Sequence, residues 1–473
     1  MKSNKIILGI SILASLFAAA CKTGNLPPSE SVPVADNYFR NIKATADTGN
    51  IADMVWRQFF RDSTLQNLIQ KGIDSNYDMQ LALKRIAASQ AQLSQAKLLQ
   101  LPTLNFEITA QSSHPSKNSL NGISLSSFLG QKHIEDYNAV FDLSWEADIW
   151  GKLRLKKDVA LAQYLQSYEA QKVIQTQIVA SIAEGYYNLL MLDEQLQITQ
   201  NNLQLTDTTL NITKLQWTAG LATNLAVQQA TAQQQTVALL IPQLKQNIAL
   251  QENALCILTG AAPNIIAREK QLSEVGIPDV LPAGVPADLI SRRPDVRSQE
   301  LALRIANAQV GIAQAEMYPS LTIDATGGVN AFKASNWFKI PASLFGSVLG
   351  GVTQPLFQRG ALKTNFRLAQ NQREQTVLAF RQSVLNAVGE VSDALVQIHR
   401  LKEQSTISYE QVGTLKSAIH NAQLLFGSGL ANYLEVITAQ GDVLQAELNL
   451  SSIRRQQLNA SVSLYRALGG GWK

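Results

Sequence analysis

Apolar residues recur at intervals of seven along two long parts of the chain. In residues 152–217 the only polar exception is Gln175, and the repeat runs through Leu161, Tyr168, Ile182, Leu189, Leu196, Leu203, Leu210 and Trp217. In residues 361–427 the exceptions are Gln370 and Ser405, and the repeat runs through Val377, Val384, Val391, Ile398, Val412, Ile419 and Phe426. A sustained repeat of seven predicts helices that supercoil around their neighbours. At about 1.5 Å per residue each would be on the order of 100 Å long, which predicts a tube or a rod.

Four shorter helices are expected beside the two long ones. Helical periodicity covers residues 78–99, 222–259, 294–316 and 431–468. Their summed lengths nearly match those of the long helices, so each long helix is expected to run beside two shorter ones placed in line. Pro242 lies inside one of them and predicts a kink rather than a break, because a mid-helix proline removes one hydrogen bond.

Two inserts, residues 102–147 and 319–357, have the pattern of strand–loop–strand units. In "LNFEITA" Leu104, Phe106 and Ile108 alternate with polar residues, which is the period of a strand with one apolar and one wet face. Four strands cannot close a barrel, so they are expected to join strands of neighbouring chains, giving eight from two chains or twelve from three. Trp337, Phe338 and Phe345 suit an aromatic girdle at a lipid boundary, with burial in a core as the alternative.

The chain contains an internal sequence repeat of two copies. "WTAGLATNLAV" at 217–227 resembles "FGSGLANYLEV" at 426–436, and their glycines, Gly220 and Gly429, are 209 residues apart (429 − 220). The first repeat is predicted at 56–260, with a strand pair at 102–147 and a coiled-coil hairpin at 152–259. A Pro- and Gly-rich connector follows at 261–290. The second repeat is predicted at 291–468, with a strand pair at 319–357 and a coiled-coil hairpin at 361–468, and a tail follows at 469–473.

The N-terminus has the features of an export signal. Lys2 and Lys5 precede the apolar stretch "IILGISILASLFAAA", and Cys21 follows it directly. Residues 1–20 are therefore expected to be a signal peptide, Cys21 to be acylated as the first mature residue, and 21–55 to be a tether; an ordinary signal with an incidental cysteine is the alternative. Cys256, the only other cysteine, is expected to pack as a small hydrophobe, so no intrachain disulfide is predicted.

Composition and motifs argue against two classes of function. The 40 basic and 36 acidic residues nearly cancel, which does not suit a nucleic-acid-binding protein. Neither a phosphate-binding loop nor a nucleophile elbow is present, and the four histidines (His114, His133, His399 and His420) share no metal-ligand spacing, so neither catalysis nor a metal site is predicted. Arg292, Arg293 and Asp295 are interpreted as structural residues at a helix start.

Several separated motifs are similar to the TolC-like outer membrane factors of tripartite efflux systems, in their lipoprotein branch. They are "VPADLISRRPDVRSQELALRIANAQVGIAQAEMYPSLTI" at 285–323, "FDLSWEADIWGKLR" at 141–154 and "GLANYLEVITAQ" at 429–440. The resemblance implies a mainly α protein that forms a homotrimer, with a twelve-stranded outer-membrane β-barrel continuous with a long periplasmic α-helical barrel. It also implies a periplasmic adaptor and an inner-membrane transporter of RND type as partners, contact with outer-membrane lipids, and no cofactor beyond a lipid on Cys21.

The resemblance places both turns at the periplasmic mouth of the tube, where such channels narrow and the adaptor docks. Gly220 and Gly429 fit the left-handed residue that ends a helix, Leu221 and Leu430 follow them, and Thr223 and Asn432 fit caps of the next helix.

Three residues after the second turn carry the remaining expectations. Glu435 is either part of an acidic ring at the constriction or half of a capping box with Asn432, and both interpretations stay open. Thr438 stands where other members place an aspartate. Tyr433 is expected to pack, with a hydrogen bond across helices as the alternative.

The function implied is a passive, gated exit duct for small molecules such as drugs or metal ions, located in the outer membrane and extending into the periplasm. A duct for secreted proteins is the alternative within the family. A lipid-anchored coiled-coil scaffold without a pore is the alternative of another class, and a periplasmic enzyme has the least support.

Overall fold

The computed structural model describes residues 51, 54–124, 127, 130, 132–276 and 292–473. The predicted signal peptide, Cys21 and most of the tether lie outside the described residues, as does part of the 261–290 connector. The chain divides into two compact units. One contains the described residues of 87–165 and 301–378; the other contains those of 31–86, 166–300 and 379–473.

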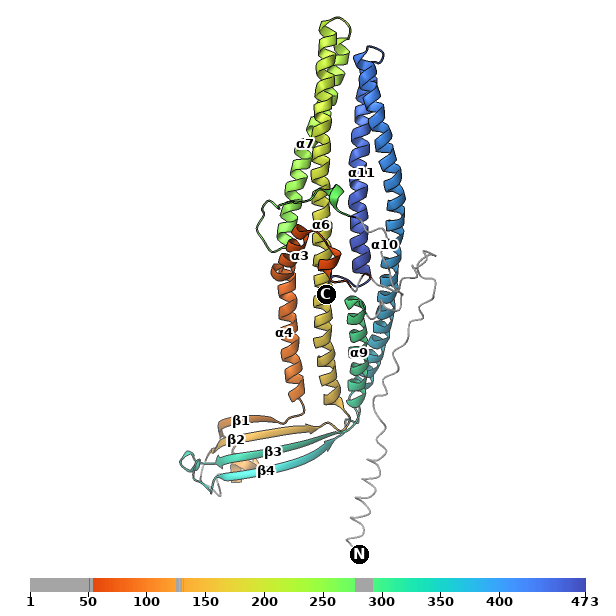
Figure 1. Ribbon diagram of the computed structural model, residues 1–473. Coiled ribbons are helices and arrows are strands. Elements are labelled where there is room, and N and C mark those ends of the chain that lie inside the picture. The colour runs from red at the N-terminus through yellow and green to blue at the C-terminus, as the bar shows by residue number, and fades with distance from the viewer. Residues whose placement is uncertain (1–50, 52–53, 125–126, 128–129, 131, 277–291) are drawn as a thin grey trace. The chain divides into compact units, whose positions relative to one another are not determined.

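The long helices predicted from the repeat of seven are present. Helix α6 (Lys152–Thr218) and helix α10 (Ala361–Gly427) have 67 residues each. Each turns back into a 35-residue helix, α7 (Asn224–Leu258) and α11 (Tyr433–Ala467) respectively, so that two helical hairpins are formed (Figure 1). Pro242 lies inside α7, and the helix continues past it, which confirms that the proline does not break it.

The shorter helices α4 (Tyr77–Leu98) and α9 (Pro294–Ala315) also lie where the sequence predicts them. The pattern did not predict α2 (Trp56–Phe59) or α3 (Ser63–Ser75). Asp62 begins α3, because its carboxylate accepts a hydrogen bond from the Leu65 N–H at 3.0 Å. Short elements complete the described chain: α5 (Leu120–Ser124), η3 (Leu272–Glu274) and η4 (Ala334–Asn336). No helix in the described ranges combines the length and the apolar character needed to cross a bilayer.

The two inserts form one four-stranded antiparallel sheet in the order β1-β2-β3-β4 (Figure 1). Its strands are β1 (Thr103–Ser113), β2 (Ile134–Ala147), β3 (Ser320–Ala331) and β4 (Leu344–Thr353). Strands β2 and β3 come from different inserts and pair directly, with Phe141 opposite Gly327. The outer strands β1 and β4 each keep one edge without a partner strand among the described residues.

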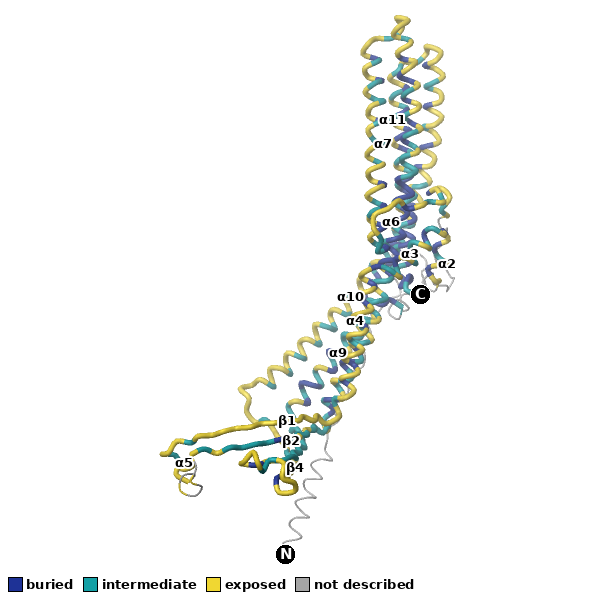
Figure 2. The backbone as a smooth tube through the Cα atoms, turned by 90° about the vertical axis from the view of Figure 1, so that its left-hand side faces the viewer, coloured by how far each residue is buried: buried dark blue, intermediate teal, exposed yellow. Residues whose placement is uncertain are grey.

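The unit that contains 166–300 and 379–473 is here called the helical unit. Its apolar core lies where α2 and α3 pack against α6, α7 and α11. It contains Tyr186, Leu189, Leu255 and Leu464, all at most 1% exposed. The ring of Tyr465 stacks on Phe59 with 4.3 Å between centroids. In Figure 2 the buried backbone gathers around α3 and α6, whereas most of α7 is exposed or half-buried. Cys256 is buried in this core as a free thiol, which confirms its predicted packing role.

Candidate functional site

The two turns that join the long helices have the same backbone conformation. Gly220 and Gly429 both have φ of +74°, in the left-handed region that favours glycine, as the sequence predicts. After each glycine the next N–H bonds back into the helix, from Leu221 to the Gln216 carbonyl at 2.8 Å and from Leu430 to the Leu425 carbonyl at 2.9 Å. These bonds satisfy the last carbonyls of the helices and define sharp, matching ends.

The predicted caps are also present. The Thr223 hydroxyl accepts a hydrogen bond from the Ala226 N–H at 3.2 Å. The Asn432 side chain accepts from the N–H groups of Leu434 at 2.9 Å and Glu435 at 3.2 Å. Only this half of the expected capping box is formed: within the described structure, no bond returns from the Glu435 carboxylate to the Asn432 backbone. Glu435 is exposed, as is Thr438, so both side chains are accessible to solvent beside the turn.

Tyr433 joins the two hairpins. Its hydroxyl donates a hydrogen bond to the side-chain oxygen of Gln229 on α7. The sequence favoured simple packing for this tyrosine; the alternative, a bond across helices, is the one that the structure shows. Because Gln229 follows the first turn and Tyr433 follows the second, this bond ties the two turns together.

The turns carry exposed apolar side chains. Leu221 and Leu430 are 81% and 78% exposed, and they are accompanied by Trp217, Leu225 and Leu434. Apolar side chains gathered on a surface mark sites where other proteins bind. The sequence named the two leucines directly after the glycines but did not identify the remaining three as part of this surface.

Substituting Tyr433 with phenylalanine is expected to loosen the two turns without unfolding the helices. Phenylalanine keeps the ring but removes one hydrogen bond, which contributes about 1 kcal/mol in typical cases. Hydrogen exchange of the residues that follow both turns, measured by mass spectrometry, is expected to be about fivefold faster than in wild type. Tyr409→Phe, at an exposed position of α10, is the control; equal exchange rates for both variants and wild type would contradict a role for this bond.

The sheet has one apolar and one polar face. The strand register places on a single face Leu104, Phe106, Ile108, Ala139, Phe141, Leu143, Trp145, Leu321, Ile323, Ala325, Val329, Leu344, Val348 and Val352. The opposite face is mainly polar and carries Asn105, Glu107, Thr109, Asp136, Asn138, Asp142, Ser144, Glu146, Thr322, Asp324, Thr326, Asn330, Ser347 and Thr353, together with the apolar Val140, Phe345 and Leu349. Side chains on the polar face bond across strands, as between Thr326 and Asp142 at 2.8 Å and between Ser144 and Asp324 at 2.6 Å.

Aromatic side chains lie at both ends of the apolar face. Trp337 packs against Phe338 and Tyr137, with ring centroids 5.0 and 5.3 Å away. At the other end, the Trp145 indole donates to the Gln100 carbonyl at 2.9 Å. The expectation that Phe345 belongs to such a girdle is wrong, because its pairing with Gly328 puts it on the polar face. Tyr137 and Trp145 were not identified as members of the girdle from the sequence. Both are an even number of residues from Phe141 in β2 and therefore lie on the same face of the sheet.

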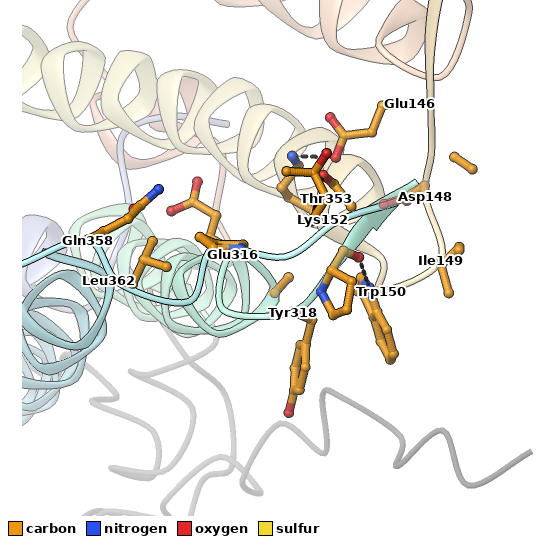
Figure 3. Close-up of a pocket in the computed structure, with 15 residues that line it drawn as sticks. Glu146, Asp148, Ile149, Trp150, Lys152, Glu316, Tyr318, Thr353, Gln358 and Leu362 are labelled. Carbon is orange, nitrogen blue, oxygen red and sulfur yellow. Dashed lines mark hydrogen bonds and ion pairs between the residues drawn. The ribbon is translucent and has the colours of Figure 1, made fainter. Parts of the chain in front are cut away.

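A cavity of about 330 Å³ lies where the strands meet the helices (Figure 3). Three of its four charged side chains are engaged in structure: Lys152 pairs with Glu146 at 2.5 Å, and Asp148 accepts from the N–H groups of Leu153 and Arg154 at 2.8 and 2.9 Å, which caps α6. Glu316 is the fourth charged residue in the lining. On its other side the Trp150 ring stacks on a neighbouring tyrosine, and its N–H donates to the Pro319 carbonyl at 2.6 Å. These contacts brace the strand-to-helix junction and do not form a nucleophile–base pair.

Arg293 has the structural role that the sequence predicted. It is 6% exposed, and its guanidinium binds Asp295 at 2.7 and 3.0 Å, Glu390 at 2.9 Å and the Ala467 carbonyl at 2.9 Å. Although burial alone would raise the pKa of Asp295, the hydrogen bonds and charge of Arg293 lower it. One arginine thus joins the beginning of α9 to α10 and to the end of α11.

The remaining titratable side chains do not assemble into a metal site. His114 and His133 stack with 5.0 Å between ring centroids near the β1–β2 loop, a pairing that their separation in sequence did not reveal. Among the described residues there is no group of three or more histidine, cysteine, aspartate or glutamate side chains suited to a metal ion.

Comparison with known proteins gives a consistent result. The profile of the family described as outer membrane efflux protein matches residues 68–261 and 285–470. The chain is 27% identical over 446 residues to the cation efflux system protein CusC of Escherichia coli O6:H1, covering 94% of both proteins. It is 29% identical over 432 residues to the toluene efflux pump outer membrane protein TtgC of Pseudomonas putida, covering 89% of this chain and 86% of that one. A membrane protein from Pseudomonas aeruginosa has a similar solved structure, with a TM-score of 0.85, 26% identity, and coverage of 95% of this chain and 100% of the other.

Proposed function

The chain belongs to the outer membrane efflux protein family, and on this premise we propose that three copies form one passive exit duct for small molecules across the outer membrane and periplasm. Members of this family are transport channels rather than enzymes, and they work with a periplasmic adaptor and an inner-membrane transporter. The duct would contribute a path, and the transporter would contribute the energy.

The observation that carries the proposal is the sheet. One face is apolar and the other is mainly polar, and within the described part of the chain β1 and β4 each have an unpaired edge. Backbone groups left unpaired in a bilayer are costly, so a sheet facing lipid must close on itself. Three chains that pair β4 of one with β1 of the next would give a twelve-stranded barrel with its apolar face toward lipid and its polar face toward a water-filled lumen.

The helical hairpins suit the periplasmic part of the duct. They have equal helix lengths, 67 and 35 residues, at a constant offset of 209 residues (361 − 152 and 433 − 224), which supports the internal repeat. Around a threefold axis they would supply twelve helices to an α-helical barrel. The exposed leucines of the turns fit an adaptor-docking surface, and Glu435 is accessible for an acidic ring at the constriction.

Small solutes are favoured over proteins as the exported material. The relatives' names specify cations and toluene, and the family matches nearly the full length of the chain. Nothing in the sheet or the turns favours a protein-secretion duct specifically. A scaffold without a pore would not require a sheet with an apolar outer face. An inner-membrane pump of RND type is the partner that the sequence resemblance implies.

Cys21→Ser is expected to abolish lipid attachment. The sulfur is the acyl acceptor in the proposed lipoprotein signal, and serine cannot replace it there. Mass spectrometry of the membrane-extracted chain is expected to show a lipid-modified N-terminal cysteine in wild type and no lipid in the variant. Cys256→Ser, which alters the buried thiol, is the control and should retain the lipid; an unmodified wild-type N-terminus would contradict the anchor.

The proposed function is tested by conductance. Purified protein reconstituted in planar bilayers is expected to give discrete channels with three chains per conducting unit. A membrane that stays sealed at protein densities that give channels for a known porin would contradict the duct.

A further inference from the structure

The second half of α6 buries polar side chains where the first half buries apolar ones. Between Ile178 and Leu192 the buried face of α6 is dominated by apolar residues. Beyond this point Leu210 is the one buried apolar residue among the described positions of α6, and the other buried positions are polar. We name these polar residues, at spacings of three and four, the polar seam: Thr199, Asn202, Thr206, Thr209 and Thr213, each at most 4% exposed. Such spacing places all five on one face of the helix.

Gln440 of α11 is inserted into this polar seam. It is 0% exposed, its amide nitrogen donates to the Thr209 hydroxyl at 2.8 Å, and its backbone carbonyl accepts from the Asn202 side chain at 3.2 Å. Two buried acceptors are left without a partner in the described structure, the side-chain oxygens of Gln440 and Asn202. A fully buried polar group without its hydrogen bond is costly, so an arrangement that gives either oxygen a donor would be favoured.

The polar seam offers Gln440 equivalent partners on either side. Thr206 and Thr213 lie three and four residues from Thr209, which is about one helical turn, or 5.4 Å, in each direction. Their hydroxyls donate to carbonyls of α6 itself, Thr206 to Leu203 at 2.8 Å and Thr213 to Thr209 at 2.8 Å, so their lone pairs remain able to accept. A glutamine amide can therefore exchange one threonine for the next.

The polar seam is linked to the turns through α11. Tyr433 and Gln440 are seven residues apart and lie on the same side of that helix. Both bond to the first hairpin, Tyr433 to Gln229 and Gln440 to Thr209. A displacement of α11 by one turn along α6 would carry the Tyr433 hydroxyl about 5.4 Å from its partner and break the bond that ties the turns.

We propose that α11 has two hydrogen-bonded registers on α6, one helical turn apart, and that Gln440 is the positioning residue that sets them by exchanging Thr209 for Thr206 or Thr213. The shifted register separates the two turns and opens the duct. The inference rests on the proposed function for its link to opening, whereas the two registers themselves do not depend on it. Discrete one-turn displacements of packed helices are a known form of two-state change.

The experiment compares valine variants of the full-length protein, because valine matches threonine in shape and lacks the hydroxyl. Thr209→Val removes the present partner of Gln440, and the double variant Thr206→Val/Thr213→Val removes both alternatives. Thr208→Val, at an exposed neighbouring position of α6, is the control. The readouts are channel open time in planar bilayers and hydrogen exchange of residues 433–445 followed by mass spectrometry.

Thr209→Val is expected to raise open time and exchange about fivefold or more, since a lost buried hydrogen bond of roughly 1 kcal/mol corresponds to that factor. The double variant is expected to shorten the channel open time and to slow hydrogen exchange of residues 433–445. Thr208→Val is expected to change neither quantity. If the single and double variants shift exchange in the same direction, or neither differs from the control, the two registers are refuted. If hydrogen exchange shifts as expected but the wild-type protein forms no channels, the two registers are supported and the proposed duct is contradicted.

Discussion

Val348→Lys abolishes assembly in the outer membrane, whereas Ser347→Lys, one residue away, is tolerated: this is the expected result if the sheet faces lipid on its apolar side. Val348 is 78% exposed in the single chain and lies on the apolar face, and Ser347 lies on the polar face. Lysine at the midplane of a lipid-facing strand costs about 2–4 kcal/mol, and three chains would carry that cost together. Lysine toward a water-filled lumen carries no such penalty.

The measurement is the amount of heat-modifiable, detergent-extracted oligomer recovered from outer membranes for wild type and both variants. Loss of the oligomer in Val348→Lys alone supports the assignment of the two faces. Equal recovery of the two variants, or loss in Ser347→Lys alone, would contradict it.

Replacing Arg293 with methionine is expected to destabilise the helical unit by about 3 kcal/mol. The guanidinium is buried and binds two carboxylates and the last carbonyl of α11, so its removal leaves these groups without their partner. Arg293→Lys is expected to be intermediate, because an ammonium cannot match the planar fork that engages Asp295. Thermal unfolding of the detergent-solubilised protein measures the loss.

Arg304→Met is the control for this substitution. It changes the same residue type to the same replacement on the same helix, α9, at an exposed position. A melting temperature equal to that of wild type is expected for Arg304→Met. The same decrease in both variants would show that Arg293 has no particular role in joining α9 to α10 and α11.

The long helices were predictable because the repeat of seven continues without a shift for 57 residues from Leu161 to Trp217 and for 50 residues from Val377 to Phe426. The ends of α6 and α10 followed from the glycines at 220 and 429, whose left-handed conformation is a local property of the chain. Helix α3 was not predicted, although Leu65, Leu68, Ile69 and Ile73 follow a helical period, because it has 13 residues and lies outside the repeat of seven on which the helix prediction was based.

The faces of the strands were predictable only where alternation is clean. In β1 the pattern gives the correct face, but β4 places Leu344 beside Phe345 and Val348 beside Leu349, so both phases of the alternation contain large apolar residues. Pairing with β3 decides the phase, and that is information from another part of the chain.

The partners of the bonds between hairpins could not be read from sequence spacing, although a bond of Tyr433 across helices was one of the alternatives. Tyr433 and Gln229 are 204 residues apart, and Gln440 and Thr209 are 231 apart. The threonines of the polar seam were overlooked for a further reason. Threonine is polar, so it does not contribute to an apolar period and is expected at the surface.

The central claim, a duct built from three chains, is tested most directly by the mass and shape of the detergent-extracted protein. Light scattering combined with negative-stain imaging gives both. With a full sequence of 51.7 kDa, we expect a mass of about three chains, less the predicted signal peptides, in a long particle that is hollow along one axis. A monomer or dimer that stays soluble without detergent would contradict the barrel and the duct.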